Sequence, residues 1–285
     1  MSRITDLVDR AGADATPLAR APRAIVATSA DDADGVWQAL SAGGTLSAAV
    51  EASVLSGLAR VYVPVGGAAV DADDAPPSET DATLVGGYRG HPVHVPNHAA
   101  GRVLVHALRL LEEDPLSDMD AAARATMCSA AVAHAVREEA RHTPLAQRLS
   151  LAAVDDFLAA DPVALSATLQ LPASTLGAPE ALLVLDAAVG GAALCRAGFP
   201  LVLVRADRPA LLVAAAGDDT AAAFALLQVV VATCDLGAGL SSALADVSPA
   251  RPCVAMLLDE RGVFQAAGSP ACEVHVRGYE RSEAQ

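Results

Sequence analysis

Hydrophobic residues along this chain fall in short runs that polar turns separate, and the pattern predicts alternating strands and helices. Residues 23–28, RAIVAT, predict a buried strand. Residues 30–58 predict two helices, because capping residues open each segment and the pair Gly43–Gly44 separates them. Residues 60–67, RVYVPVGG, predict a second strand rich in β-branched residues. A strand, helices and a strand in this order are typical of a parallel crossover unit.

The rest of the chain continues this alternation. A polar loop rich in Pro and Asp is expected at 70–82, and an amphipathic helix after Asn97. Two apolar stretches rich in small residues predict buried helices, one from Pro179 to just before Gly198 and one at 207–217. The other expected elements are an irregular β segment or hairpin at 83–96, helices across 118–172, a strand at 199–206, a helix at 218–234, a hairpin at 253–268 and a strand at 272–280.

We therefore predict an α/β fold with three layers, in which a mostly parallel sheet is flanked by helices, with a helical middle segment and a C-terminal hairpin. Residues 1–22 are expected to form an N-terminal helix and linker. Residues 23–285 are expected to form a single domain with a helical insertion at about 118–172. Ligands of open parallel sheets bind beyond the carboxyl ends of the strands, so residues there are the first candidates for a site.

Composition and charge narrow the class of protein. Hydrophobic residues make up 53% of the chain and aromatic residues only 3%, so Ala, Val and Leu must build the core. The net charge is −15 and every basic residue is Arg, which argues against nucleic acid or an anionic membrane as a partner. The five cysteines form no CxxC pair, and the sequence shows neither an apolar leader nor a membrane span. We therefore expect a cytoplasmic protein with buried thiols, and a homo-oligomer such as a dimer, because small-residue helices would otherwise expose apolar surface.

Two stretches of the chain are similar to a known enzyme family. The first is PRAIVATSADDAD together with LSAGGTLSAAVEASVLSGLARVYVPVGGAAVDAD, and the second is GAPEALLVLDAAVGGAALCRAGFPLVLVRADRPALLVAAA. Their order of strands, acidic turns and Ala-rich helices resembles the nicotinate-nucleotide–dimethylbenzimidazole phosphoribosyltransferases. The resemblance implies a Rossmann-like, nucleotide-binding fold and the transfer of phosphoribose from a nucleotide such as nicotinate mononucleotide to a nitrogenous base. We expect no cofactor.

The chain departs from that family at both of its signature loops. The family's Gly-rich phosphate loop corresponds here to AARATMCSAAV, which keeps Thr126 but none of the glycines. The family's general-base Glu lies between two glycines, and here Ala238 stands between Gly237 and Gly239. Because alanine cannot accept a proton, either another carboxylate acts as the base or this chain does not run the reaction.

Three carboxylates are candidates for that catalytic role. Asp31 and Asp32 follow the first strand, and Glu180 lies beside Pro179 in the second matching stretch. Such a group can act as a base, bind a ribose hydroxyl or stabilise a cationic sugar. The alternative is structural, because each of them also suits the first turn of a helix, where the helix dipole stabilises negative charge.

A second group of residues suits phosphate binding. Arg205 is the best-placed cation, because a guanidinium matches phosphate oxygens, and an ion pair with Asp207 is the alternative. His98 stands at a helix start whose free N–H groups attract anions, and an ordinary capped helix is the alternative. Backbone N–H and hydroxyl groups of two Gly-rich turns complete the candidates for substrate binding: Gly43, Gly44, Gly237, Gly239, Ser241 and Ser242.

The stretch GYRGHPVHVPNH places three histidines close together and raises the question of a metal site. His91 and His94 point to opposite faces if this segment is extended, and His98 then begins a helix. We predict no metal here, and expect exposed or loop-bonded histidines, with convergence on a metal ion as the alternative.

Three other histidines lie on or beside expected helices. His106 falls on the polar side of its helix, with Arg102 on the same side. His134 and His142 lie on or after a later helix, and we expect them to face solvent or to be satisfied in the core.

These observations leave two main hypotheses for function. The first is a phosphoribosyltransferase-like enzyme that binds a nucleotide or base. The second is a catalytically silent relative that binds a small ligand or acts as a partner subunit. The retained acidic residues favour the first, and the loss of both signature loops favours the second. A third hypothesis is an unrelated α/β enzyme with its site near the histidine segment. The transferase hypothesis requires Asp31, Glu180 and Arg205 to share one hollow.

Overall fold

The computed structural model describes residues 10–11, 16–18, 23–43, 46, 59–64, 83–171, 176–186, 190–246, 251–259, 263–270 and 272–279. Gly44, the expected polar loop at 70–82 and nearly all of the helix expected at 45–58 lie outside these residues. So does most of the segment 1–22, of which two short strands are described.

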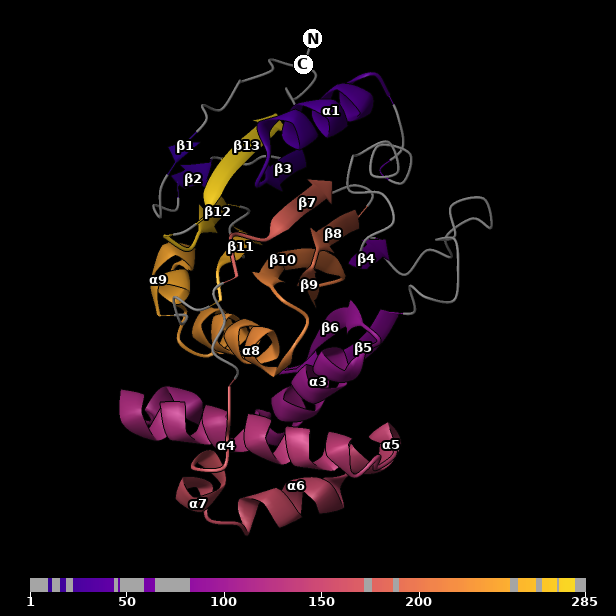
Figure 1. Ribbon diagram of the computed structural model, residues 1–285. Helices are drawn as coiled ribbons and strands as arrows, with labels where there is room; N and C mark the ends of the chain where they lie inside the picture. Colours follow the sequence, from indigo (N-terminus) through magenta and orange to yellow (C-terminus); the bar gives the residue numbers. More distant parts are fainter. Residues whose placement is uncertain are drawn as a thin grey trace.

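Two antiparallel sheets form the centre of the molecule (Figure 1). The first, in spatial order, consists of β1 (Arg10–Ala11), β13 (Glu273–Tyr279), β3 (Arg23–Ala27), β7 (Glu180–Asp186), β8 (Gly190–Arg196) and β4 (Ala59–Pro64). The second consists of β2 (Thr16–Leu18), β12 (Phe264–Gly268), β11 (Cys253–Leu258), β10 (Arg208–Ala216), β9 (Gly198–Arg205), β6 (His91–Pro96) and β5 (Thr83–Tyr88). Each sheet packs against the other through one face, and a shared apolar core lies between them.

Helices cover the outer faces of both sheets (Figure 1). Helix α1 (Ala30–Ser41) packs on the first sheet. Helices α3 (Ala99–Leu111), α8 (Thr220–Cys234) and α9 (Leu240–Ala245) pack on the second. Beyond α3 and α8 lies a further group of helices, here called the lower helices: α4 (Ala121–Ala140), α5 (Leu145–Arg148), α6 (Leu151–Leu158) and α7 (Pro162–Ser166), which the short 3-10 helix at Leu116–Asp118 precedes.

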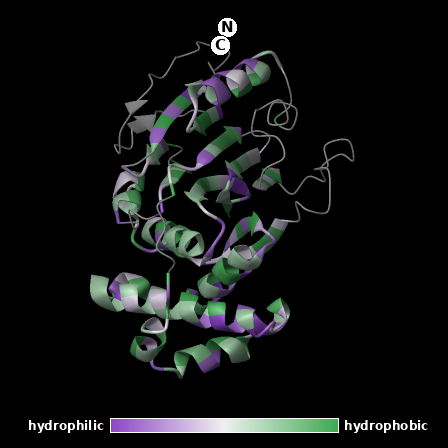
Figure 2. Ribbon diagram, viewed as in Figure 1, coloured by the Kyte–Doolittle hydropathy of each residue, from purple (hydrophilic) through white to green (hydrophobic). Residues whose placement is uncertain are grey.

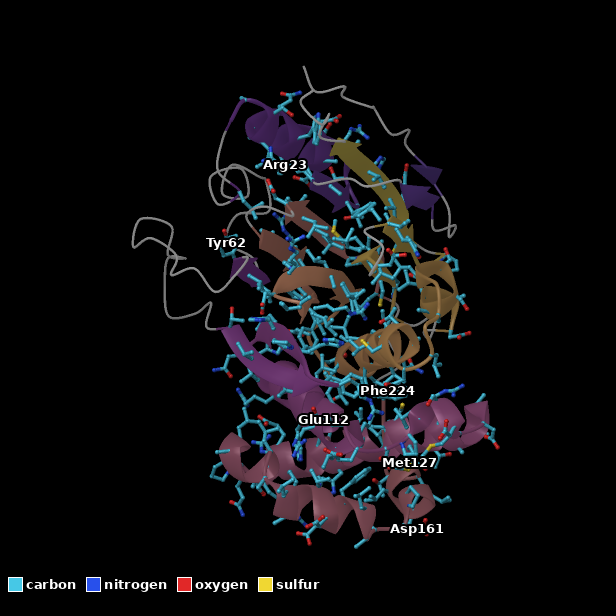
Figure 3. The ribbon with its side chains drawn as sticks, turned by 180° about the vertical axis from the view of Figure 1, so that it is seen from behind. Arg23, Tyr62, Glu112, Met127, Asp161 and Phe224 are labelled. Carbon is cyan, nitrogen blue, oxygen red and sulfur yellow. The ribbon has the colours of Figure 1, made fainter. Side chains whose placement is uncertain are left out.

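The view from behind shows the length of this stack (Figure 3). Arg23 lies at the α1 end, and Asp161, which caps α7, lies at the opposite end among the lower helices. Phe224 on α8 and Met127 on α4 are both partly buried, and both pack against the apolar core that joins the second sheet to the helices. The lower helices are therefore attached to the body of the protein by buried apolar contacts.

The strands are hydrophobic on both faces because both faces are covered. In β7, Ala181, Leu183 and Leu185 belong to the core between the two sheets, whereas Leu182 and Val184 belong to the core under α1. Figure 2 shows the strands and α8 coloured largely as hydrophobic, in contrast to the mixed colouring of α4. Burial of these side chains is the main source of stability, since each fully buried Val or Leu contributes about 1.5–3 kcal/mol.

The predicted three-layer, mostly parallel sheet is wrong. Every strand pair among the described residues is antiparallel, and the strands form two stacked sheets. The parallel crossover expected between β3 and β4 does not form, because β7 and β8 lie between them. The helix predicted after Pro179 is instead the pair β7 and β8, and the helix predicted at 207–217 is strand β10.

Several individual elements are confirmed. The strand predicted at 23–28 is β3, the helix after Asn97 is α3, and the helix at 218–234 is α8 with Asp219 as its N-cap. The hairpin at 253–268 is β11 and β12, and the final strand is β13. Elements with a clear cap or clear amphipathic spacing are thus predictable, even though the sheet that contains the strands is not.

A polar network joins the β5–β6 turn to the ends of two helices. The hydroxyl of Tyr88 and the guanidinium of Arg89 both donate to the carboxylate of Asp235, the Arg89 Nε lying 2.8 Å from Asp235 Oδ1. Arg89 also donates to the backbone carbonyls of Glu112 and Asp114, just beyond α3. Tyr88 is fully buried and the Asp235 side chain is 6% exposed, so these hydrogen bonds anchor the turn to the interior of the protein.

The five cysteines are free, and four of them are buried. Burial raises the pKa of the Cys195 thiol to about 12, which keeps it protonated. No helix in the described ranges is long and apolar enough to span a membrane.

Candidate functional site

One end of the two sheets gathers three of the predicted carboxylates. Strand β7 begins at Glu180, whose side chain is 62% exposed and forms an ion pair with Arg196 at 3.2 Å. Strand β3 runs antiparallel to β7 and ends at the same place, and Asp31 and Asp32 follow in the first turn of α1. The structure therefore brings the three candidate acids to one end of the first sheet, where Asp31 and Asp32 occupy the first-turn positions that a helix dipole favours.

His98 lies at the same end of the sheets and caps helix α3. Its Nδ1 accepts a hydrogen bond from the N–H of Gly101 at 3.3 Å, and its ring lies edge-on to Phe199, with 5.0 Å between the ring centroids. Burial lowers the pKa of His98, and the nearby charge of Asp218 opposes this shift in part. His98 thus has the capping role, which is the structural alternative to anion binding at this position.

Arg205 and Asp207 lie at the other end of the sheets. They belong to the β9–β10 hairpin, in which Ala206 and Asp207 have positive φ angles of 48° and 59°. Strand β9 starts beside the end of β8, where Glu180 lies, and its eight residues span roughly 25 Å before Arg205. Arg205 lines a separate hollow of about 450 Å³ together with Arg208 and Asp259. The shared hollow that the transferase hypothesis requires is therefore not formed by these residues.

In the second Gly-rich turn, backbone N–H groups are already hydrogen-bonded within the protein. The N–H of Ala238 donates to the carbonyl of Ala232 at 3.0 Å, and the N–H of Leu240 donates to Gln265 Oε1 at 3.2 Å. These N–H groups are therefore engaged inside the protein and do not point to a phosphate. Of the residues predicted to bind through these turns, Gly43 follows α1 with a φ of 89°, Gly237 has a φ of 57°, Gly239 is the N-cap of α9, and Ser241 and Ser242 lie within α9.

The histidine segment does not assemble a metal site. His91 and His94 lie on β6, and His98 follows it. Within the described residues, no three His, Cys, Asp or Glu side chains gather in a way that could hold a metal ion.

A cavity of about 350 Å³ lies among the lower helices and is the strongest candidate site. Its volume falls at the lower end of the roughly 300–1,000 Å³ typical of pockets for small molecules. Side chains from α3, α4, α5 and α6 and from the loops between them form the wall: His106, His134, Arg137, Glu138, Arg141, Thr143, Gln147, Arg148, Ser150, Ala152, Ala153 and Asp156. We call this space the helical cavity.

His106 contributes to this wall from α3. The residue is fully buried on α3, and neither Nδ1 nor Nε2 has a hydrogen-bond partner among the described residues. Buried polar groups in proteins are nearly always paired with protein, water or a ligand, because an unpaired one costs about 1–3 kcal/mol. The two ring nitrogens of His106 are therefore the groups of this wall at which a water or a ligand would complete the hydrogen bonding.

His134 and Arg137 form the adjoining wall on α4. Arg137 Nη2 lies 3.0 Å from His134 Nδ1, and because a guanidinium can only donate, Nδ1 must be the unprotonated nitrogen. The rings of His134 and His106 meet edge to face, with 5.6 Å between centroids. Burial, and then the charge of Arg137, lowers the pKa of His134, so the ring is neutral and carries its proton on Nε2.

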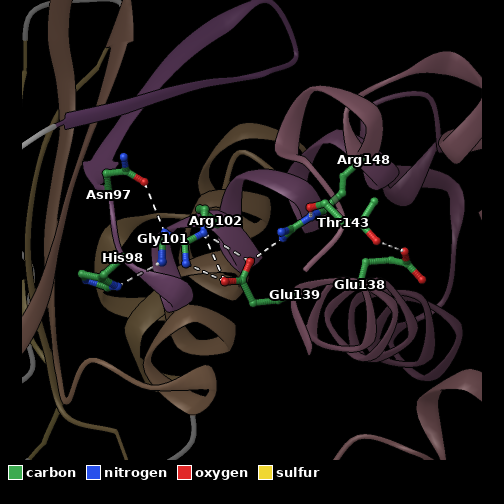
Figure 4. A network of polar contacts seen from close by, with 8 residues as sticks. All are labelled: Asn97, His98, Gly101, Arg102, Glu138, Glu139, Thr143 and Arg148. Carbon is green, nitrogen blue, oxygen red and sulfur yellow. Dashed lines mark hydrogen bonds and ion pairs between the residues drawn. The ribbon is translucent and has the colours of Figure 1, made fainter. Parts of the chain in front are cut away.

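A partly buried ion network holds this wall together (Figure 4). Glu139 accepts hydrogen bonds from Arg102 of α3, at 2.6 Å, and from Arg148 of α5. The hydrogen bond from Arg102 is the main reason that the pKa of Glu139 lies below its ordinary value. Arg148 is 4% exposed and also donates to the carbonyl of Thr143. The network fixes α3, α4 and α5 relative to one another and so sets the shape of the helical cavity.

The sequence does not point to this cavity. Its pattern puts His106 on the polar side of a helix, whereas the structure buries it without a partner among the described residues. For His134 the sequence predicts a side chain that faces solvent or is satisfied in the core, and the structure shows the second arrangement, with Arg137 as its partner. One signal is present. Polar residues recur at helical spacing on α3, at Arg102 and His106, and again on α4, where His134, Arg137 and Glu138 lie within one turn. Two rows of polar residues of this kind, one on each helix, can face each other and line a cavity. The sequence alone does not show that α3 and α4 pack in this way.

The buried His106 predicts an acid-sensitive fold. Burial, with added repulsion from His134 and Arg148, lowers the pKa of His106 to about 4, below its ordinary value near 6.5. Between these values the unfolded chain binds a proton that the folded chain does not, so the free energy of unfolding falls as the pH falls through this window. His106 alone contributes a loss of about 3 kcal/mol. Urea unfolding at a series of pH values from about 7 to about 4 measures this loss. The free energy of unfolding of a His106→Gln variant should fall less steeply with pH than that of the wild type. If both fall equally steeply, His106 is not the group responsible.

Comparison with known proteins identifies the class of fold. No family model matches the sequence, and no curated protein matches it. Solved structures do match: the chain is similar to a cephalosporin acylase from Bacillus halodurans, with a TM-score of 0.53, 12% identity and coverage of 70% of this chain and 53% of that chain. It is also similar to LmbA2991HD, with a TM-score of 0.50, 15% identity and coverage of 74% and 58%. These neighbours have the fold of the N-terminal-nucleophile hydrolases.

This likeness shows the fold and nothing more, because the identities are low. The chain spans a little over half the length of the solved structures that it matches. Neither structure indicates the phosphoribosyltransferase family that the two sequence stretches resemble. The transferase hypothesis therefore stays a prediction without support from the fold.

Proposed function

We propose that this chain binds a small polar molecule in the helical cavity and that binding, not hydrolysis, is its activity. One observation carries the proposal: His106 is fully buried in the wall of a 350 Å³ cavity, and both of its ring nitrogens lack a partner among the described residues. A second feature supports it. The walls are fixed by the Glu139 network, so the cavity is preformed, and preformed pockets lose less entropy on binding.

The acylase among the structural neighbours raises hydrolysis as the competing function. Hydrolysis needs a nucleophile that a neighbouring base activates, and three hydroxyl groups among the described residues show no such base. Thr28 is bonded to the backbone of Ala181, Thr143 to Glu138, and Ser269 to Cys253 and Cys272, so the hydrogen bonds of these three side chains involve no histidine that could act as a base. Burial keeps the Cys195 thiol protonated, and thiolate is the nucleophilic form.

The test is a thermal-shift screen of the full chain with small polar metabolites, followed by calorimetry. A ligand present at about 100 times its dissociation constant should stabilise the protein by about 2.7 kcal/mol. Two variants at exposed alanines serve as a pair: Ala152→Phe places a bulky side chain at a position that lines the cavity, whereas Ala159→Phe, at the C-cap of α6, places the same side chain outside it. Stabilisation that Ala152→Phe removes and Ala159→Phe keeps supports the proposal. A screen without a hit, a hit that both variants retain, or turnover of an amide substrate would overturn it.

A further inference from the structure

The charges around the helical cavity indicate what kind of molecule it takes. Three arginines and two carboxylates line it. Arg148 is bound to Glu139 and to the Thr143 carbonyl and has a structural role. Glu138 is likewise engaged, with Arg141 at 2.7 Å and with the Thr143 hydroxyl at 2.9 Å. The pKa of Glu138 lies below its ordinary value, since these hydrogen bonds outweigh the effect of burial, so it remains a carboxylate.

Two guanidinium groups at the rim keep donors for a ligand. The side chains of Arg137 and Arg141 are 46% and 62% exposed. Each guanidinium has five N–H donors, and the contacts to His134 and Glu138 use only some of them. Paired N–H groups in this planar arrangement match the two oxygens of a carboxylate.

The first turn of α6 lies in the wall of the same cavity. Its N-cap, Ser150, accepts a hydrogen bond from the N–H of Ala153, whereas the N–H groups of Leu151 and Ala152 come too early in the helix to have an intrahelical partner. A helix start of this kind attracts an anion. The unpartnered imidazole of the buried His106 is the independent sign that a ligand enters here.

Two further features restrict the ligand: the first limits its negative charge, and the second selects the polar group at its far end. Asp156 lines the cavity from α6, and Glu138 lines it from α4, so a second negative charge on the ligand would meet repulsion. His106 is neutral near pH 7 and offers one donor and one acceptor, which suits an amide or hydroxyl at the far end of the ligand.

We infer that the helical cavity selects a small monocarboxylate with a neutral polar group at its other end. Its carboxylate lies between the guanidinium groups of Arg137 and Arg141 and the first turn of α6, and its amide or hydroxyl reaches His106. This inference rests on the proposed binding function and adds the class of ligand to it.

The experiment uses three probes of nearly equal size: succinamate, which has one carboxylate and one amide, the diamide succinamide and the dicarboxylate succinate. Calorimetry on the full chain should show succinamate binding about tenfold more tightly than either of the others, a difference of about 1.4 kcal/mol. Arg141→Gln should remove the preference for succinamate over succinamide, and His106→Phe should weaken both. Arg196→Gln, in an exposed ion pair outside the helical cavity, is the control and should change nothing.

The outcomes separate this inference from the proposed function. If succinamide binds as tightly as succinamate and Ala152→Phe abolishes both, the cavity binds neutral molecules and the carboxylate inference fails, while the proposed function stands. If succinate binds most tightly, the limit to one charge fails. If none of the probes binds but the wider screen finds a ligand that depends on Ala152, the ligand class is wrong and the function survives. If no molecule binds in the cavity at all, both fail.

Discussion

Replacing Arg89 by Gln is expected to lower the free energy of unfolding by about 3 kcal/mol. Removing one partner of a buried ion pair costs about 3–5 kcal/mol, because the other charge stays buried without compensation. The Asp235 carboxylate would keep only the Tyr88 hydroxyl, and the carbonyls of Glu112 and Asp114 would lose their donors. The Arg89 side chain is 26% exposed, which places the expected loss at the lower end of that range.

Urea unfolding of matched variants measures this loss. Arg196→Gln removes an arginine from an ion pair with the exposed Glu180 and should cost at most about 1 kcal/mol. Arg89→Lys keeps the charge but not the fork of donors, and should fall between the wild type and Arg89→Gln. Equal losses for Arg89→Gln and Arg196→Gln would show that the network does not hold the turn.

Replacing Gly198 by Ala is expected to cost about 3 kcal/mol or to prevent folding. A Cβ at this position would lie 2.0 Å from the Cys195 sulfur and 2.6 Å from the carbonyl oxygen of Ala215. Overpacking of a well-packed core costs about 1–3 kcal/mol, and contact with backbone leaves the least room for relief. Strand β9 starts at this glycine, where the chain passes from β8 of the first sheet to β9 of the second, so a shift of its backbone would disturb both sheets.

Gly87→Ala is the matched control for this substitution, because Gly87 also lies in a strand and a Cβ there meets nothing within 4 Å. We expect Gly87→Ala to change the free energy of unfolding by less than about 1 kcal/mol. The double variant Cys195→Ala with Gly198→Ala should recover only part of the loss, because the Ala215 carbonyl remains. Complete recovery would show that the sulfur alone fills the space. Thermal and urea unfolding of the soluble variants supply these values.

The sequence shows where elements begin and end better than how they pair. Helices α3 and α8 are predictable because each has a cap, His98 and Asp219, and enough length to distinguish it from a strand. Strands β7 and β10 are not, because in such strands both faces are apolar: Leu182 and Leu183 are equally buried on opposite faces of one sheet. A strand covered on both faces loses the alternation of polar and apolar residues and looks like a buried helix.

The same double burial explains the error in topology. Continuous apolar strands are typical of parallel sheets, which helices cover on both sides. Here a second sheet covers one face, and this produces the same pattern with antiparallel pairing. Which strands pair is decided by contacts between distant residues, such as Val26 with Leu183 and with Val276, and no local pattern encodes them.

The candidate site is less predictable than the fold. Its central residue, His106, is separated in sequence from Arg137 and Ser150, and the three meet only because the lower helices pack together. The residues singled out by sequence lie at strand ends and helix starts, and most of them have local structural roles, such as the capping by His98. A site at the ends of parallel strands is expected from a fold that the chain does not have.

The placement of β13 bears on how this protein is made. Strand β3 is synthesised early, yet one of its two neighbours in the sheet, β13, comes from the far part of the chain, with His275 opposite Ala27. During translation the edge of β3 that β13 will cover has no native mate until β13 itself has left the ribosome. That edge can recruit strands of other nascent chains in the meantime, so we expect the yield of folded protein to depend more on elongation rate and chaperones than on the strength of the finished core.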